Sequence, residues 1–125
     1  MYKRQIRICF IDYDREMALV ADYRDPQTGE REIIAMGRWS RTYDRDEAEF
    51  SLLVRDGFQR RGLGTELLRR LVAIGRDERL HRLTAVILPQ NQGMLRICSK
   101  LGFHTHLVER DYLMYSELIL AGSGK

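Results

Sequence analysis

The sequence has little of what would mark a disulfide-rich, zinc-binding, membrane-spanning or secreted protein. Its 125 residues include two prolines, one tryptophan and two cysteines. Cys9 and Cys98 lie far apart among apolar neighbours, which indicates two buried reduced thiols rather than a disulfide framework or a zinc site. No apolar run approaches the roughly 18 residues that a membrane span needs, and no signal-peptide core follows the first residues. We therefore expect a cytoplasmic protein that does not insert into a membrane.

Lysine is also scarce, because only Lys3, Lys100 and Lys125 contribute to the 21 basic residues. The arginines are interleaved with acids rather than clustered, and the net charge is only +3, so a nucleic-acid partner is not predicted. Arginine does favour bidentate contacts to phosphate and carboxylate. The chain length and a hydrophobic fraction of 44% predict one domain over residues 1–125, with a flexible tail at 121–125.

Hydrophobic periodicity divides the chain into a β-rich first half and a mixed second half. In the first half, strands are expected over 17–23, 33–39 and 48–54. The second half has an amphipathic helix after Gly62, a buried strand over 83–88, a helix from Met94 to Leu101, and closing strands over 103–109 and 112–120. The order β-β-β-α-β-α-β-β predicts an α/β (α+β) fold, with a mixed, mostly antiparallel sheet and helices on both of its faces.

The segment Gln59-Arg60-Arg61-Gly62-Leu63-Gly64-Thr65 joins a strand to a helix and is the strongest functional signal. Two glycines let the backbone turn and approach a ligand closely, and the first helical amides attract an anion. A Walker A loop would need Lys after the last glycine, but Thr65 stands there. A dinucleotide fingerprint would need a third glycine, but Leu67 stands there. A strand–turn–helix with incidental glycines remains the alternative.

Two motifs together resemble the GNAT family of N-acetyltransferases over nearly the whole chain. Gln59-Arg60-Arg61-Gly62-Leu63-Gly64 is similar to the family's coenzyme A pyrophosphate loop. About thirty residues on, Asn91 to Gly102-Phe103 is similar to the family's second motif. Ile11 to Ala18 and Ala48 to Asp56 resemble one branch, the protein lysine acetyltransferases fused to an acyl-CoA-synthetase-like region. The resemblance implies transfer of acetyl from acetyl-CoA, without a metal, to a lysine of a metabolic enzyme such as an acyl-CoA synthetase.

The resemblance also implies a set of cofactor-binding residues. Backbone amides around Arg61, Gly62, Leu63, Gly64 and Thr65 would bind the pyrophosphate, and Gln59 belongs to the same loop. Arg60 and Arg61 could pair with the phosphates, although Arg60 could equally be part of a solvated basic turn. The strand end at Leu53 and Val54 would bond the pantetheine amides through its backbone. Asn91 would contact the pantetheine arm or the adjacent strand, with a helix N-cap as the alternative reading.

Glu49 is the expected catalytic base. A lysine ammonium, with a reference pKa near 10.4, must lose a proton before it can attack a thioester, and a carboxylate could accept that proton directly or through water. Burial in the apolar strand over 48–54 would raise the pKa of Glu49 into a useful range. By composition alone Glu49 would point to solvent, but its position matches a catalytic glutamate of the resembling acetyltransferases.

Two departures from the family pattern leave a second function open. Many relatives have a tyrosine at the position of Cys98, where it protonates the departing thiolate, whereas a cysteine here favours helix packing; Tyr112 and Tyr115 remain possible donors. Few residues precede Asp12, so the strand and helices that normally begin the domain are expected to be missing or shortened. The chain is then a fragment, or another domain or subunit completes the acceptor site. A non-catalytic acyl-CoA-binding regulatory module is therefore the alternative to an enzyme.

Overall fold

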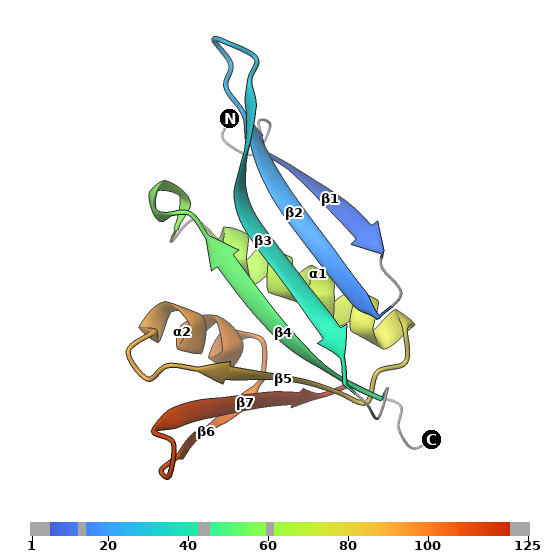
Figure 1. The fold of residues 1–125 in the computed structure, drawn as a ribbon, viewed down its shortest axis with the longest axis vertical. Coiled ribbons are helices and arrows are strands. Elements are labelled where there is room, and N and C mark those ends of the chain that lie inside the picture. The colour runs from blue at the N-terminus through green and yellow to red at the C-terminus, as the bar shows by residue number, and fades with distance from the viewer. Residues whose placement is uncertain (1–5, 13–14, 43–45, 60–61, 121–125) are drawn as a thin grey trace.

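Seven strands form one sheet in the computed structural model, which describes residues 6–12, 15–42, 46–59 and 62–120. The strand order is β1-β2-β3-β4-β5-β7-β6 (Figure 1), and β4 and β5 are its parallel neighbours. In chain order the elements are β1 (Ile6–Asp12), β2 (Glu16–Arg24), β3 (Arg31–Arg41), β4 (Glu47–Val54), a short 3-10 helix η2 (Asp56–Phe58), α1 (Leu63–Asp77), β5 (Arg82–Ile87), α2 (Gln92–Lys100), β6 (His104–Val108) and β7 (Leu113–Ile119). This mixed, mostly antiparallel α/β fold confirms the predicted class.

The predicted order lacks one strand, β1, which pairs antiparallel with β2 from Ile6↔Tyr23 to Asp12↔Met17. Its residues alternate as Ile6, Arg7, Ile8, Cys9 and Phe10, a two-residue period that the sequence analysis did not use. Ile6 and Ile8 pack against the core. The short alternation is therefore a local signal for β1, and its position as the edge strand, with β2 as its neighbour, is what the tertiary pairing adds.

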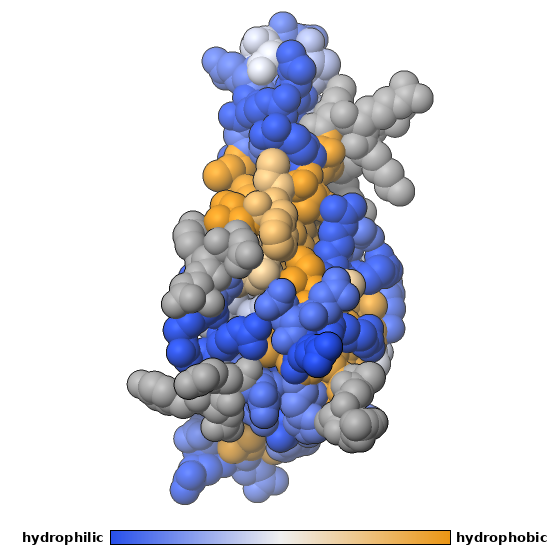
Figure 2. All heavy atoms as spheres, turned by 90° about the vertical axis from the view of Figure 1, so that its right-hand side faces the viewer, coloured by the Kyte–Doolittle hydropathy of each residue, from blue (hydrophilic) through white to orange (hydrophobic). Residues whose placement is uncertain are grey.

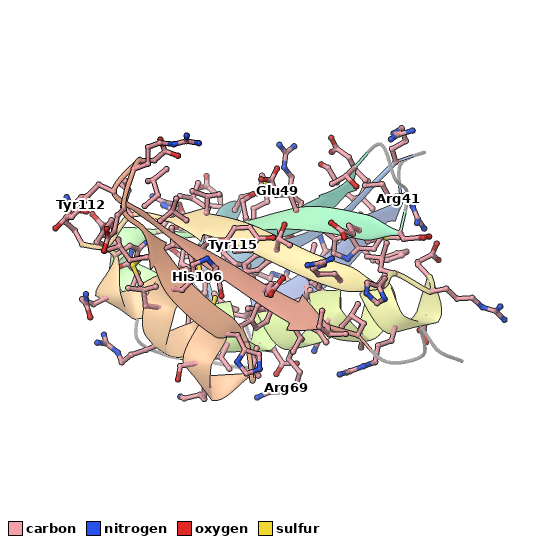
Figure 3. All side chains as sticks on the ribbon, turned by 90° about the horizontal axis from the view of Figure 1, so that it is seen from below. Arg41, Glu49, Arg69, His106, Tyr112 and Tyr115 are labelled. Carbon is pink, nitrogen blue, oxygen red and sulfur yellow. The ribbon has the colours of Figure 1, made fainter. Side chains whose placement is uncertain are left out.

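Both helices cover the same face of the sheet (Figure 3), whereas helices on both faces were expected. The connection from β4 to β5 and the connection from β5 to β6 each join parallel strands and advance in the same direction along the sheet. Since such crossovers are right-handed, two that advance the same way place both helices on one side. The close approach of α2 to α1 agrees with this arrangement, since a Cβ at Gly64 on α1 would lie 2.9 Å from Ile97 Cδ1 on α2. The opposite face carries no helix among the described residues.

The core lies between α1 and the central strands, and its tightest point is Gly37 on β3. A Cβ at Gly37 would lie 2.7 Å from Leu52 Cδ2 and 3.2 Å from Leu71 Cδ1, so the missing side chain lets α1 approach the sheet closely. Trp39, two residues on, is 1% exposed, and its indole N–H donates to the carbonyl of Leu71 at 3.2 Å. The apolar stripe of α1 is buried here, with Leu67 and Leu71 completely inaccessible.

An apolar area interrupts the polar surface on the side seen in Figure 2, where β1 forms the sheet edge. From β1, Phe10 is 54% exposed and Ile11 is 37% exposed. None of the helices in the described part of the chain is long and apolar enough to cross a membrane.

Replacing Leu71 by alanine tests the packing of α1 on the sheet. We expect Leu71→Ala to lower the free energy of unfolding by about 2–5 kcal/mol, because it opens a cavity between α1 and Trp39. The measurement is urea unfolding followed by the fluorescence of Trp39. Leu88→Ala is the matched control, since Leu88 is 58% exposed and its truncation leaves no cavity. Equal losses for the two variants would contradict this account of the core.

Candidate active site

The site begins where β4 and β5 separate. The two strands pair over three residues each, with Glu47↔Arg82, Ala48↔Leu83 and Glu49↔Thr84. Beyond that point β4 continues to Val54 and β5 to Ile87 without pairing to each other. The edge of β4 that faces this opening therefore presents backbone N–H and C=O groups to any ligand that enters it. An extended ligand with amide groups could bond to such an edge as an added strand would.

The N-terminus of α1 lies next to this opening. Gly62 is the N-cap residue and adopts the left-handed conformation, with φ of 83°, which glycine tolerates without strain. It provides no side-chain cap, and the first intrahelical bond is the one from Glu66 N–H to Gly62 C=O, at 3.0 Å. The amides of Leu63, Gly64 and Thr65 therefore precede the first intrahelical donor, and together with the helix dipole they favour an anion.

A cavity of about 660 Å³ connects the strand opening with the start of α1. The described residues that line it come from the end of β4, the loop before α1, the first turn of α1, and α2. They are Leu52, Leu53, Val54, Gln59, Gly62, Gly64, Thr65, Asn91, Gly93, Met94, Arg96, Ile97 and Lys100. The cavity combines apolar and polar side chains, a helix terminus that favours an anion and a free strand edge, which together suit a long ligand with a phosphate at one end.

Most of the predicted cofactor-binding residues meet in this cavity. Gln59 lines it and also donates its side-chain N–H to the carbonyl of Val54 at 2.9 Å, so it ties the loop to the strand end. Leu63 differs, because its side chain is buried in the core and its contribution is limited to the backbone. Arg60 and Arg61 lie outside the described residues, and their pairing with phosphates stays a prediction.

Asn91 has the capping role that was one of the two readings of this residue. Its side-chain oxygen accepts a hydrogen bond from Met94 N–H at 3.1 Å, so it is the N-cap of α2, a type of bond that stabilises a helix by about 1 kcal/mol. It also lines the cavity. The capping bond is by itself a sufficient reason for an asparagine at this position. Contact of Asn91 with a ligand stays a prediction.

Sequence reasoning missed the basic side of the cavity. Arg96 and Lys100 are both exposed and both line it. They stand four residues apart and therefore lie on the same face of α2. This helical spacing of two basic residues is present in the sequence and could have predicted a basic face. Their charges add to the positive end of α1 around the same space.

The first turn of α1 also contains an acidic residue, Glu66, whose charge is paired with arginines of the same helix. Glu66 is ion-paired with Arg69 and with Arg70, the latter at 2.8 Å. The hydrogen bond from Arg70, followed by the charges of both arginines, holds the pKa of Glu66 below its usual value. Glu66 therefore stays ionised, but its charge is balanced along the helix and opposes a bound anion less than a free carboxylate would.

Glu49 lies at the last residue pair before β4 and β5 separate. It stands out from the face opposite the helices (Figure 3) and is exposed. The buried setting that we expected for it is therefore wrong for the described chain. Strand alternation explains this, because Ala48 and Phe50 point into the core and Glu49 between them must point away. Its place at the apex of the opening still puts a carboxylate where a ligand would emerge from the cavity.

Cys98 takes no part in lining the cavity. Its side chain is completely inaccessible, and burial raises the pKa of its thiol, an effect that a hydrogen bond with Ser116 partly offsets. Cys98 is thus a packing residue on the core side of α2, which confirms the reading that we preferred for it. In the described part of the chain, no group of three or more His, Cys, Asp or Glu side chains could hold a metal ion.

A parallel strand pair that splays beside a helix start with a glycine N-cap is an arrangement suited to a ligand that carries an anionic group. Comparison with known proteins identifies the family. The model of the acetyltransferase (GNAT) domain matches residues 3–104. The chain therefore belongs to the GNAT acetyltransferase family, as the two motifs predicted.

Three relatives illustrate this membership. An acetyltransferase of Pseudomonas aeruginosa is 28% identical over 93 residues, which are 74% of this chain and 49% of that protein. The GNAT domain of PAT from S. lividans is 29% identical, with a TM-score of 0.72 over 89% of this chain and 65% of that one. A cAMP-binding acyltransferase from Mycobacterium smegmatis is 26% identical, with a TM-score of 0.70 over 89% of this chain and 33% of that one. The chain thus spans about half the length of the curated relative.

A third solved structure shares the fold at lower identity. It is an acetyltransferase from Salmonella typhimurium that was solved with its cofactor acetyl-CoA, and it is 24% identical, with a TM-score of 0.72 over 88% of this chain and 68% of that one.

The burial of Cys98 has a chemical consequence that can be measured. In a Cys9→Ala variant, we expect Cys98 to stay unreacted with Ellman's reagent at pH 8 in the folded protein. Its raised pKa leaves less thiolate at that pH, and the core excludes the reagent. Full reaction should follow in denaturant. Rapid reaction in the folded protein would show that Cys98 opens toward the cavity, and would restore it as a possible proton donor.

Proposed function

We propose that this protein transfers an acetyl group from acetyl-CoA to a primary amine, namely the ε-amine of a lysine on another protein. The observation that carries the proposal is the cavity that joins the unpaired edge of β4 to the glycine-capped start of α1, in a chain of the GNAT family. A metabolic acyl-CoA synthetase is the acceptor that the sequence resemblance favours. A cytoplasmic location is part of the proposal, consistent with two cysteines that form no disulfide.

Acetyl-CoA fits the cavity with its phosphates toward α1 and its thioester toward β4 and β5. The amides of Gly62, Leu63, Gly64 and Thr65 bind the pyrophosphate, assisted by Arg60 and Arg61. Arg96 and Lys100 supply further positive charge for the phosphates. The pantetheine arm runs along Leu53 and Val54, where it occupies the free edge of β4. Contact with the arm would bring Asn91 into the site in addition to its capping role.

The reaction requires a neutral amine at the apex of the strand opening. Glu49 takes the proton from the lysine ammonium, directly or through one water molecule. The amine nitrogen then attacks the carbonyl carbon of the thioester, and the bond between carbon and sulfur breaks. Glu49 is exposed in the chain alone, so we propose that the docked acceptor, or a further domain or subunit, covers it and excludes water.

The helix-free face provides a surface for the acceptor. A groove of about 650 Å³ lies there, lined by Ile11, Arg15, Glu16, Ala18, Val20, Met36 and Arg38. It reaches the neighbourhood of Glu49 through Ser40, which pairs with Glu16 on β2 and with Glu49 on β4. An apolar floor with arginines at its rim suits a polypeptide segment with apolar and acidic residues beside the lysine. A polycation would instead favour an acidic groove.

A non-catalytic acyl-CoA-binding regulatory module is the second candidate. The exposed Glu49 and the buried Cys98 in the position of the usual tyrosine favour it. Such a module would bind acetyl-CoA without turnover. Incubation with radiolabelled acetyl-CoA and purified acyl-CoA synthetase separates the two, because an enzyme labels lysines of the synthetase and a binding module does not.

Filling the cavity at Gly64 tests the cofactor site. A Cβ at Gly64 would lie 2.9 Å from Ile97 Cδ1 and 3.8 Å from Val54 Cγ2. We expect Gly64→Val to weaken acetyl-CoA binding by about tenfold or more, because its methyl groups occupy the space between α1, β4 and α2. Isothermal titration calorimetry measures the effect.

Gly57→Val is the matched control, because a Cβ at Gly57 would have no neighbour within 4 Å and Gly57 does not line the cavity. Unchanged affinity in Gly64→Val, with the fold intact by circular dichroism, would place acetyl-CoA elsewhere.

Replacing Glu49 by glutamine tests the base. We expect kcat at pH 7 to fall by about a hundredfold or more, the usual contribution of a positioned base, with acetyl-CoA affinity unchanged. The deficit should shrink as the pH rises toward 10, because more of the acceptor lysine is then neutral without help. The measurement is a pH series of acetyl transfer rates, and Glu30→Gln at the β2–β3 turn is the control. A variant with the wild-type rate at pH 7 would remove Glu49 from the mechanism.

A further inference from the structure

Tyr115 on β7 stands beside the same strand opening as Glu49. Thr84 pairs with Glu49 on one side and with Glu117 on the other, so these three residues share one face of the sheet. Tyr115 is two residues from Glu117 on β7 and therefore points to that face as well. Its partner on β5 is Val86, which lies just past the point where β4 and β5 separate. Figure 3 labels both Glu49 and Tyr115.

The two side chains flank the apex from opposite strands. β5 lies between β4 and β7, so two strand spacings of roughly 4.8 Å each separate the strands that carry Glu49 and Tyr115. A thioester that emerges between β4 and β5 would have the carboxylate on one side and the phenol on the other. The apex thus holds one group that can accept a proton and one that can donate a proton.

The departing thiolate needs a proton that α2 does not provide. A thiol has a reference pKa near 8.5, so coenzyme A leaves more readily at neutral pH when its sulfur is protonated as the bond breaks. Cys98 cannot supply this proton, because it is completely buried among core residues and points to Ser116. Thr84 on β5 also carries a hydroxyl on this face, but the residue is only 7% exposed.

The surroundings of Tyr115 keep its phenol in the protonated form. Its ring packs against His106, with ring centroids 5.5 Å apart, and the residue is half-buried. Burial, followed by the charge of Glu117, raises the pKa of Tyr115, and the charge of Arg82 and then a hydrogen bond with Thr84 act in the opposite direction. Titratable groups from each neighbouring strand surround it, namely Glu47 and Glu49 on β4, Arg82 on β5, His104 and His106 on β6, and Glu117 on β7.

We propose that Tyr115 is the proton donor of the acetyl transfer, an inference that rests on the proposed function. The amine nitrogen, which has already given one proton to Glu49, bonds to the carbonyl carbon, and its second surplus proton goes to water. The bond between carbon and sulfur breaks with its electron pair on sulfur, and the phenol O–H of Tyr115 gives its proton to that sulfur. The tyrosinate then recovers a proton from solvent. The products are an acetylated lysine and free coenzyme A.

The test is Tyr115→Phe, which retains the ring and its packing and removes only the hydroxyl. We expect kcat to fall by about tenfold or more, with the acceptor KM and the calorimetric Kd of acetyl-CoA changed by less than about twofold. Tyr112→Phe is the matched control, because Tyr112 is 66% exposed and lies in the turn between β6 and β7. It should leave all three quantities unchanged.

Each contrary outcome has a distinct meaning. A wild-type kcat in Tyr115→Phe overturns the inference, and so does a raised acceptor KM with unchanged kcat, which would make Tyr115 an acceptor contact. Circular dichroism and retained acetyl-CoA binding show that the variant is folded. Failure of the proposed function is recognised separately, because the wild-type protein would then bind acetyl-CoA without acetylating any lysine.

Discussion

The separation of β4 from β5 after three residue pairs is the constraint on which the rest of the site depends. A sheet that continued to pair would satisfy its own backbone groups and leave no room for a ligand. By ending the pairing at Glu49 and Thr84, the chain leaves one edge of β4 available within an otherwise continuous seven-stranded sheet. That edge adds backbone polar groups to a cavity wall that also carries apolar and basic side chains, and it runs straight into the loop that begins α1.

The geometry of the opening is maintained from the helix side. Gly37 lets α1 lie close to β3, and the indole of Trp39 fixes Leu71 by a hydrogen bond to its carbonyl. With the middle of α1 held in this way, its first turn is held beside Val54, and a Cβ at Gly64 would meet both Val54 and Ile97. Below the opening, Phe50 and Phe103 meet edge to face, with ring centroids 5.4 Å apart. The cofactor side is therefore rigid and well packed, in keeping with a preformed site.

The opposite face has a different physical character. Glu49, Tyr115 and the groove along β2 and β3 lie where no helix of the described chain packs, and side chains such as Leu53 are exposed, in that case by 72%. Strand alternation sends every second residue of β4 to this face, so the residues that do the proposed chemistry are those that the core does not need. Under the proposed function, this division would assign cofactor binding to the helix side and acceptor binding to the open side, with the two substrates meeting at the apex of the opening.

The sequence by itself determined the six strands and two helices with strong periodicity, the glycine-capped helix start and, through two motifs, the family. These features are local, because they depend on side-chain alternation, on turn chemistry and on short spacings. Tertiary structure alone decided the features that depend on pairing and handedness. Strand β1 takes its place at the sheet edge by pairing with β2, both helices share a face because two right-handed crossovers advance the same way, and Glu49 is exposed because Ala48 and Phe50 take the buried positions. The nearness of Tyr115 to Glu49 is of the same kind, since register across β5 brings together residues 66 positions apart in the chain.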